Sequence, residues 1–86
     1  MTAVQENKKK FVEGELAAML KVAYSNAEKI KNVYYFCVED AEYESVYIEL
    51  EPYREGGEGR RIMVDITADS LSAIVNDVVR AMARYY

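Results

Sequence analysis

The sequence predicts an α+β fold: a single two-layer domain of order α-β-β-β-α, in which a three-stranded antiparallel meander carries two helices packed on one face. Three observations predict it. The chain has 86 residues, enough for one modest core, so we take residues 1–86 as one domain. Helical apolar periodicity marks both ends of the chain. Three short stretches with strand alternation, separated by turn residues, lie between them.

The first element is a long helix, expected over 8–31. Two starts fit it: Thr2 and Gln5 have the spacing of a capping box, whereas a start at Asn7 leaves residues 1–7 as a frayed tail. Gly14 costs about 1 kcal/mol relative to alanine, which favours fraying of the turns before it. The expected buried stripe recurs at three- and four-residue spacing, at Val12, Leu16, Met19, Ala23, Ala27 and Ile30.

The first strand is expected over 33–38, and both of its faces are apolar. One face would carry Val33, Tyr35 and Cys37, and the other Tyr34, Phe36 and Val38. A two-layer domain buries only one face of each strand. The sequence therefore leaves open which face of this strand lies against the helices.

The second and third strands, expected over 45–51 and 60–66, alternate with period two. We expect Leu50 to lie opposite Ile62, because that register also sets Glu51 opposite Arg61 as a charge pair. The inward positions of the two strands are Val46, Ile48, Leu50, Ile62, Val64 and Ile66.

The last helix is expected over 68–85, with Thr67 or Asp69 as its N-cap. Double-stranded-RNA-binding domains share this order of elements and begin the last helix with lysines. Here the same place carries Asp69, so the likeness is one of element order and does not extend to function. The buried stripe is expected at Leu71, Ile74, Val75, Val78, Met82 and Tyr85.

Charge argues against direct binding of nucleic acid. The net charge is −4, and phosphate contacts require a basic surface. Between residues 39 and 58, Arg54 is the single basic residue among eight acids, which are Glu39, Asp40, Glu42, Glu44, Glu49, Glu51, Glu55 and Glu58. This segment is the main electrostatic feature of the chain, and it favours a basic partner.

The sequence offers little for catalysis or metal binding. It contains no histidine, so histidine-activated nucleophiles and histidine metal sites are absent. Cys37 lies between apolar neighbours and is expected to be a core residue. The acidic run 39–44 lacks the glycine turn and ligand spacing of a calcium loop. We therefore expect a protein that is not an enzyme and has no cofactor or metal.

Cysteine usage and hydropathy indicate the cytoplasm. A lone cysteine provides no intramolecular disulfide. The lysines at 8–10 are followed by Glu13 and Glu15 rather than by the apolar run of a signal peptide, and no stretch reaches the length of a membrane span.

Eight tyrosines point to a contact surface, because tyrosine gives a large contact area at low entropic cost. We expect a non-catalytic protein-binding module, with self-association and no membrane contact. Its partner would be a basic nucleic-acid-handling protein, by analogy with the small acidic anti-defence inhibitors of phages and mobile elements. The expected partner-binding residues are Tyr34, Phe36, Tyr43, Tyr47, Glu39, Asp40, Glu42, Glu44 and Glu49.

Two alternatives stay open. In the first, the protein is a homodimeric accessory or structural protein that pairs through the strand over 33–38, which is apolar on both faces. In the second, Arg54, Arg60 and Arg61 around the glycine-rich loop at 56–59 bind a small anion. The acids at 55 and 58 would repel such an anion, so we expect a hairpin loop there.

Overall fold

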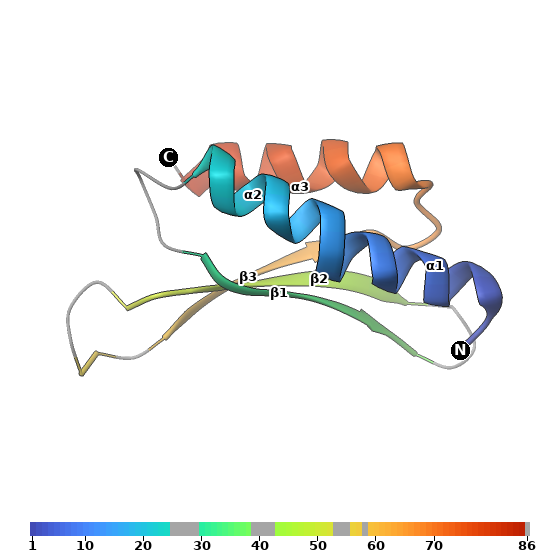
Figure 1. Cartoon of the computed structure of the whole chain (residues 1–86), viewed down its shortest axis with the longest axis horizontal. Coiled ribbons are helices and arrows are strands. Elements are labelled where there is room, and N and C mark those ends of the chain that lie inside the picture. The colour runs from blue at the N-terminus through green and yellow to red at the C-terminus, as the bar shows by residue number, and fades with distance from the viewer. Residues whose placement is uncertain (25–29, 39–42, 53–55, 58, 86) are drawn as a thin grey trace.

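A computed structural model describes residues 1–24, 30–38, 43–52, 56–57 and 59–85 of the chain. The described residues follow the order helix–strand–strand–strand–helix, and their three strands form an antiparallel sheet in the order β1-β2-β3. Both helices lie on the same side of this sheet (Figure 1). The expected fold class, an α+β meander with two helices on one face, is confirmed.

The first helix runs through three consecutive segments, α1 (Ala3–Phe11), the π-helical η1 (Val12–Leu16) and α2 (Ala17–Ala23). Its start is a capping box. The Thr2 hydroxyl accepts a hydrogen bond from the Gln5 N–H at 3.1 Å, and the Gln5 side chain accepts one from the Thr2 N–H at 2.8 Å. The capping-box start at Thr2 is therefore confirmed, and the expected start at residue 8, with residues 1–7 as a frayed tail, is wrong because the helix begins at Ala3.

The expected end of this helix at residue 31 was wrong, because the helix ends at Ala23. Ile30 belongs to β1, where it pairs with Leu50. A β-branched residue packs well on a pleated sheet, which agrees with this placement. Ala27, expected in the buried stripe, lies outside the described residues.

The buried stripe of the first helix also differs from the expected one. Val12 and Leu16 are buried as expected, but the next large buried residue is Leu20, 3% exposed, whereas Met19 is 52% exposed and Ala23 is also exposed. A π-helical turn contains more residues than an α-helical turn, so the residue that faces the sheet after this turn comes later in the sequence. The large buried residues Val12, Leu16 and Leu20 are therefore four positions apart.

The strands are β1 (Ile30–Cys37), β2 (Glu44–Leu50) and β3 (Arg60–Asp65). Their bounds differ from the expected ones by three residues at most, and the start of β3 at Arg60 is as expected. Val33 and Tyr35 are buried under the helices, whereas Tyr34 and Phe36 are exposed. This settles which face of β1 is covered.

The expected register between β2 and β3 was wrong by two residues. Ile62 lies opposite Ile48 rather than Leu50, and Arg61 lies opposite Glu49 rather than Glu51. A slip of two residues keeps every side chain on its own face, so period-two alternation could not distinguish the registers.

The last helix, α3 (Leu71–Tyr85), begins later than expected. Neither Thr67 nor Asp69 caps it. Ser70 does so, since its hydroxyl accepts a hydrogen bond from the Ala73 N–H at 3.3 Å. The core lies between the two helices and the sheet, and it consists of Val12, Leu16, Ala17, Leu20, Val33, Tyr35, Val46, Ile48, Leu50, Ile62, Val64, Ile66, Ile74, Val78 and Met82.

Candidate protein-interaction surface

The sheet face opposite the helices carries large apolar side chains. Three cross-strand rows cross it. The central row pairs Tyr34 with Tyr47 and Tyr47 with Met63. The flanking rows are Asn32–Glu49–Arg61 and Phe36–Ser45–Asp65. We call this surface the aromatic face and define it by Tyr34, Phe36, Val38, Tyr43, Tyr47 and Met63.

Ring contacts link the side chains of the aromatic face. The Phe36 ring meets the rings of Tyr43 and Tyr47 edge to face, with centroid distances of 6.4 and 6.1 Å. The Tyr43 hydroxyl donates to the Met63 sulfur at 3.2 Å, and the Arg61 guanidinium lies 4.9 Å from the Tyr47 ring centroid. These contacts restrict the rotamers of the exposed rings, so part of the entropic cost of binding has already been met.

The acidic residues expected to flank this surface fall into three groups. Glu39, Asp40 and Glu42 lie outside the described residues. Glu49 lies at the border of the aromatic face, where it contacts Lys31 at 3.8 Å. Glu44, in contrast, points to the helix side and is 2% exposed. Its expected role in partner contact is therefore corrected: Glu44 is a core residue.

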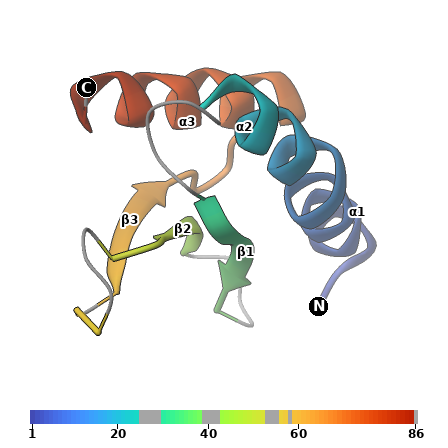
Figure 2. The same ribbon diagram turned by 60° about the vertical axis from the view of Figure 1, so that its left-hand side comes forward.

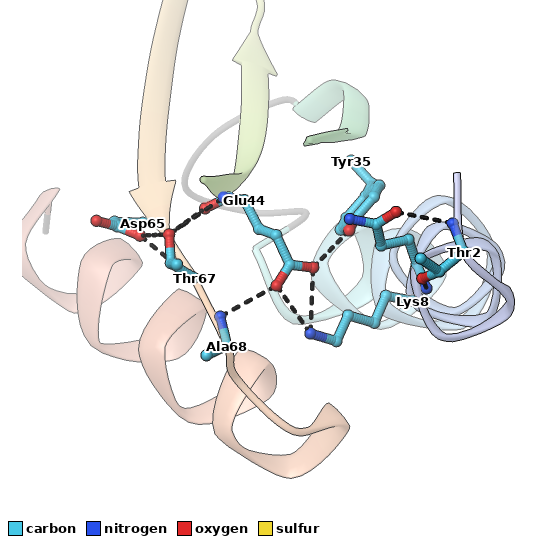
Figure 3. Close-up of polar contacts among 8 residues, drawn as sticks. Thr2, Lys8, Tyr35, Glu44, Asp65, Thr67 and Ala68 are labelled. Atoms are coloured by element: carbon cyan, nitrogen blue, oxygen red, sulfur yellow. Dashed lines mark hydrogen bonds and ion pairs between the residues drawn. The ribbon is translucent and has the colours of Figure 1, made fainter. Parts of the chain in front are cut away.

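Glu44 is the centre of a buried polar cluster (Figure 3). Its carboxylate accepts two hydrogen bonds from the Lys8 ammonium, at 3.0 and 3.1 Å, and one from the Tyr35 hydroxyl. The Ala68 N–H donates to it at 3.0 Å. These partners connect α1, both of the first two strands and the turn after β3. Lys8 is 8% exposed and Tyr35 is 6% exposed, so the cluster offers no access to a substrate.

The ionisation of the cluster follows from its geometry. Burial alone would raise the pKa of Glu44, but the hydrogen bonds from Tyr35, Lys8 and Ala68 and the charge of Lys8 outweigh it and hold that pKa below its ordinary value. Burial and the hydrogen bond to Glu44 raise the pKa of Tyr35. Glu44 is thus an ionised acceptor and Tyr35 a neutral donor.

The turn after β3 is built around the same carboxylate. Ala68 has a φ of 62°, a left-handed conformation that costs a non-glycine residue about 1 kcal/mol. The Ala68 N–H bond to Glu44 holds it there. The Thr67 hydroxyl accepts from the Glu44 N–H at 3.1 Å, and Asp65 Oδ1 accepts from both the N–H and the hydroxyl of Thr67. Those two bonds hold the pKa of Asp65 below its ordinary value.

A second pair of carboxylates lies beside this turn. Burial and the neighbouring Asp77 carboxyl raise the pKa of Asp69 to about 6, with Asp65 adding to the effect and Lys8 opposing it. Asp69 Oδ2 is buried and has no hydrogen-bond partner among the described residues. Asp69 has an ordinary pKa of 3.8, so the folded state binds its proton more tightly than the unfolded chain does.

Replacing Asp77 by asparagine is expected to raise the free energy of unfolding at pH 7 by about 1–2 kcal/mol, because the carboxylate repulsion is removed. The folded pKa of Asp69 is raised, so its stabilising contribution is complete below about pH 3.8 and is lost as the pH rises through about 6. The gain of Asp77→Asn should therefore disappear at pH 4. Urea unfolding at both pH values measures this gain, and Glu15→Gln is the charge-matched control. An equal gain at pH 4 would contradict the repulsion between the carboxylates of Asp69 and Asp77.

Of the three arginines of the alternative anion site, the structure describes Arg60 and Arg61, and both have other contacts. Arg54 lies outside the described residues. Arg60 donates to the Glu51 carbonyl oxygen at 2.7 Å, and Arg61 lies over Tyr47. A shallow hollow of about 350 Å³ beside them also contains Glu49, whose carboxylate would repel an anion. Anion binding stays a prediction.

The part of the chain that the structure describes contains no candidate metal site and no candidate membrane span. There, no three histidine, cysteine, aspartate or glutamate side chains are placed to hold a metal ion, and Cys37 is a half-buried free thiol. None of the described helices has the length and apolarity needed to cross a membrane. Comparisons of the chain with models of known families, with curated proteins and with solved structures find no match.

Sequence reasoning did not identify the polar cluster. Lys8 and Glu44 are separated by 36 positions, and each stands among residues of its own charge sign, so no local pattern connects them. One signal was present. Glu44 has the same strand parity as the inward residues Val46 and Ile48, and this parity would have placed its carboxylate on the helix side.

Proposed function

We propose that this chain is a non-catalytic protein-binding module that contacts its partner through the aromatic face. One observation carries the proposal: Tyr34, Phe36, Val38 and Met63 are 43%, 47%, 46% and 56% exposed on a single sheet face, while most side chains of the opposite face are buried under the helices. Single exposed apolar residues are common, but a contiguous group of this kind marks an interaction site.

The chemistry of the aromatic face suits a protein partner. Tyrosine and phenylalanine bury large areas at low entropic cost and are frequent anchors of protein interfaces. The rings already contact one another, so little further ordering is needed. Glu49, Arg61 and Asp65 border the rings and provide the polar rim that such interfaces carry.

The partner class follows from charge. The chain carries a net charge of −4, and seven acids other than the buried Glu44 fall between residues 39 and 58. A protein that binds nucleic acid presents the complementary basic surface. We therefore assign the module to an acidic inhibitor of a nucleic-acid-handling protein, of the kind used against host defences. Its free thiol is consistent with action in the reducing cytoplasm.

Replacing Phe36 by aspartate should abolish partner capture. Tagged wild-type protein is incubated with host lysate, and bound proteins are eluted by rising salt and identified by mass spectrometry. Phe36 lies at the centre of the ring contacts, so its loss should weaken binding by about 30-fold, as for an interface hot spot. Val22→Asp is the matched control, since Val22 is 78% exposed on the helix side and should not affect capture.

Equal loss of capture in both variants would indicate general unfolding or non-specific binding, and unchanged capture in both would contradict the proposed surface. Charge is tested separately with Glu39→Lys, Asp40→Lys and Glu42→Lys combined. This variant leaves Glu44 in place, because Glu44 is buried. Elution at lower salt is expected, whereas elution at the wild-type salt concentration would overturn the electrostatic part of the proposal.

A further inference from the structure

The two edges of the sheet are not equivalent. The Tyr35 N–H points away from β2 and donates to the Glu13 carboxylate of η1 at 3.0 Å. The pairing of β1 with β2 is also irregular between Ile30 and Asn32, and the first helix packs along β1 (Figure 2). An irregularity and a charged side chain on the edge are devices that prevent strand addition. The β1 edge is therefore closed.

In the described part of the chain, the β3 edge shows no irregular pairing, and no side chain accepts a hydrogen bond from its outward backbone N–H groups. The Ile66 N–H donates to the Glu44 carbonyl oxygen at 3.0 Å, so in β3 the residues of the same parity, Ile62 and Val64, turn their backbone groups toward β2. Arg61, Met63 and Asp65 consequently turn their N–H and C=O groups outward. The pairing of β3 with β2 is regular throughout. The described residues offer these outward groups no partner.

We propose that a second copy of this chain occupies the β3 edge, with the two β3 strands antiparallel about a two-fold axis at Met63. This register sets Arg61 opposite Asp65 of the second copy, and Asp65 opposite Arg61 of the second copy. In this register each outward-facing residue of one β3 lies directly opposite an outward-facing residue of the other β3. Such a pair exchanges two N–H···O=C hydrogen bonds, so Arg61, Met63 and Asp65 all form backbone hydrogen bonds across the axis.

Charge selects this register among the alternatives. A centre at Arg61 or at Asp65 would place two like charges opposite each other. A centre at Ile62 or at Val64 would pair Met63 with a charged residue and form no ion pair. Only the centre at Met63 forms two ion pairs. In this register Ile62 lies opposite Val64 of the second copy, so the apolar inner faces are also continuous.

The surface beside the axis carries both signs of charge, as a self-complementary interface needs. A groove of about 260 Å³ lies between β3 and α3, and Asp77, Arg80 and Arg84 line it together with Met63 and Asp65. Both bonds from Thr67 go to Asp65 Oδ1, so neither of them occupies Oδ2. The resulting six-stranded sheet would set two aromatic faces side by side on one surface.

This inference does not rest on the proposed function, because the pairing uses neither Phe36 nor any acid of the 39–42 segment. It uses the other edge of the sheet from the alternative pairing through the strand at 33–38. Dimer formation with no partner capture would overturn the proposed function alone, and partner capture by a monomer would overturn the dimer alone.

The test is sedimentation equilibrium of charge-reversed variants. Wild type should sediment at twice the chain mass of 9.9 kDa at micromolar concentration. Arg61→Glu and Asp65→Lys should each weaken the dimer by about 10- to 100-fold, because both ion pairs become repulsive. An equimolar mixture of the two variants should restore it as a heterodimer, in which every opposed pair is again attractive. A monomeric wild type, or a mixture that stays monomeric, would overturn the proposal.

Circular dichroism shows whether the charge-reversed variants fold. If one of them does not, a second measurement tests the same pairing. Met63→Cys in a Cys37→Ser background should form a disulfide-linked dimer on mild oxidation, because residues opposed on the axis have Cα atoms about 5.5 Å apart. Tyr34→Cys in the same background is the control and should stay unlinked. Linkage of the control alone would overturn the proposal and favour the β1 side.

Discussion

Replacing Glu44 by glutamine is expected to lower the free energy of unfolding by about 3–5 kcal/mol at pH 7. The substitution removes the charge that balances the buried Lys8 ammonium and puts an amide where Tyr35 and Ala68 donate hydrogen bonds. A domain of this size has a stability of only about 4–13 kcal/mol, so a large fraction of it is lost. Urea unfolding followed by circular dichroism measures the change.

Glu49→Gln is the matched control. Glu49 also lies on β2 and contacts a lysine, but its ion pair with Lys31 is partly exposed and 3.8 Å long. Loss of such a surface pair should cost less than about 1 kcal/mol. If Glu44→Gln costs no more than Glu49→Gln, the buried cluster does not contribute to stability as we infer.

The pH dependence provides an independent check of the same cluster. The folded pKa of Glu44 is below its ordinary value of 4.5. Its contribution is therefore complete above about pH 4.5 and is lost as the pH falls through the folded pKa. Wild type should lose stability in this acid range, and Glu44→Gln should lose much less there.

Leu20→Ala is expected to cost about 2–5 kcal/mol, whereas Met19→Ala should cost less than about 0.5 kcal/mol. Leu20 is 3% exposed in the core, and truncating it leaves a cavity. Met19 is 52% exposed on the same helix and is the residue that regular helical spacing places in the core. Urea unfolding of the two variants measures the difference directly.

The comparison of Leu20 with Met19 tests the π-helical turn itself. With an unbroken α-helix over the first 23 residues, the stripe after Leu16 would continue through Met19. Equal costs for the two variants, or a larger cost for Met19→Ala, would contradict the burial of Leu20 in place of Met19 that follows η1.

Local patterns predicted the elements because they depend on neighbouring residues. Alternation identified β2 and β3, and the spacing of Thr2 and Gln5 was one of two starts that the sequence allowed for the first helix. The same local rules failed where the structure depends on contacts between residues far apart in the sequence. The register of β3 was wrong by two residues, because that slip changes neither face of the strand.

The candidate surface was predicted in part. Phe36 and Tyr47 belong to one contiguous face, together with Met63, which was not expected there. Strand β1 is apolar on both sides, so its own residues could not show whether Tyr34 or Tyr35 is exposed. The packing of the first helix against Tyr35 decided this.

The order of elements, the meander and the helix-covered faces of β2 and β3 follow from the sequence alone, because apolar periodicity reports which residues avoid water. Only the tertiary structure decided the place of Glu44. An acid in an acidic segment is expected in solvent, and burial of its charge is costly unless it is paired. Lys8 and Tyr35, distant in the sequence, provide that pairing only once the helix has packed on the sheet.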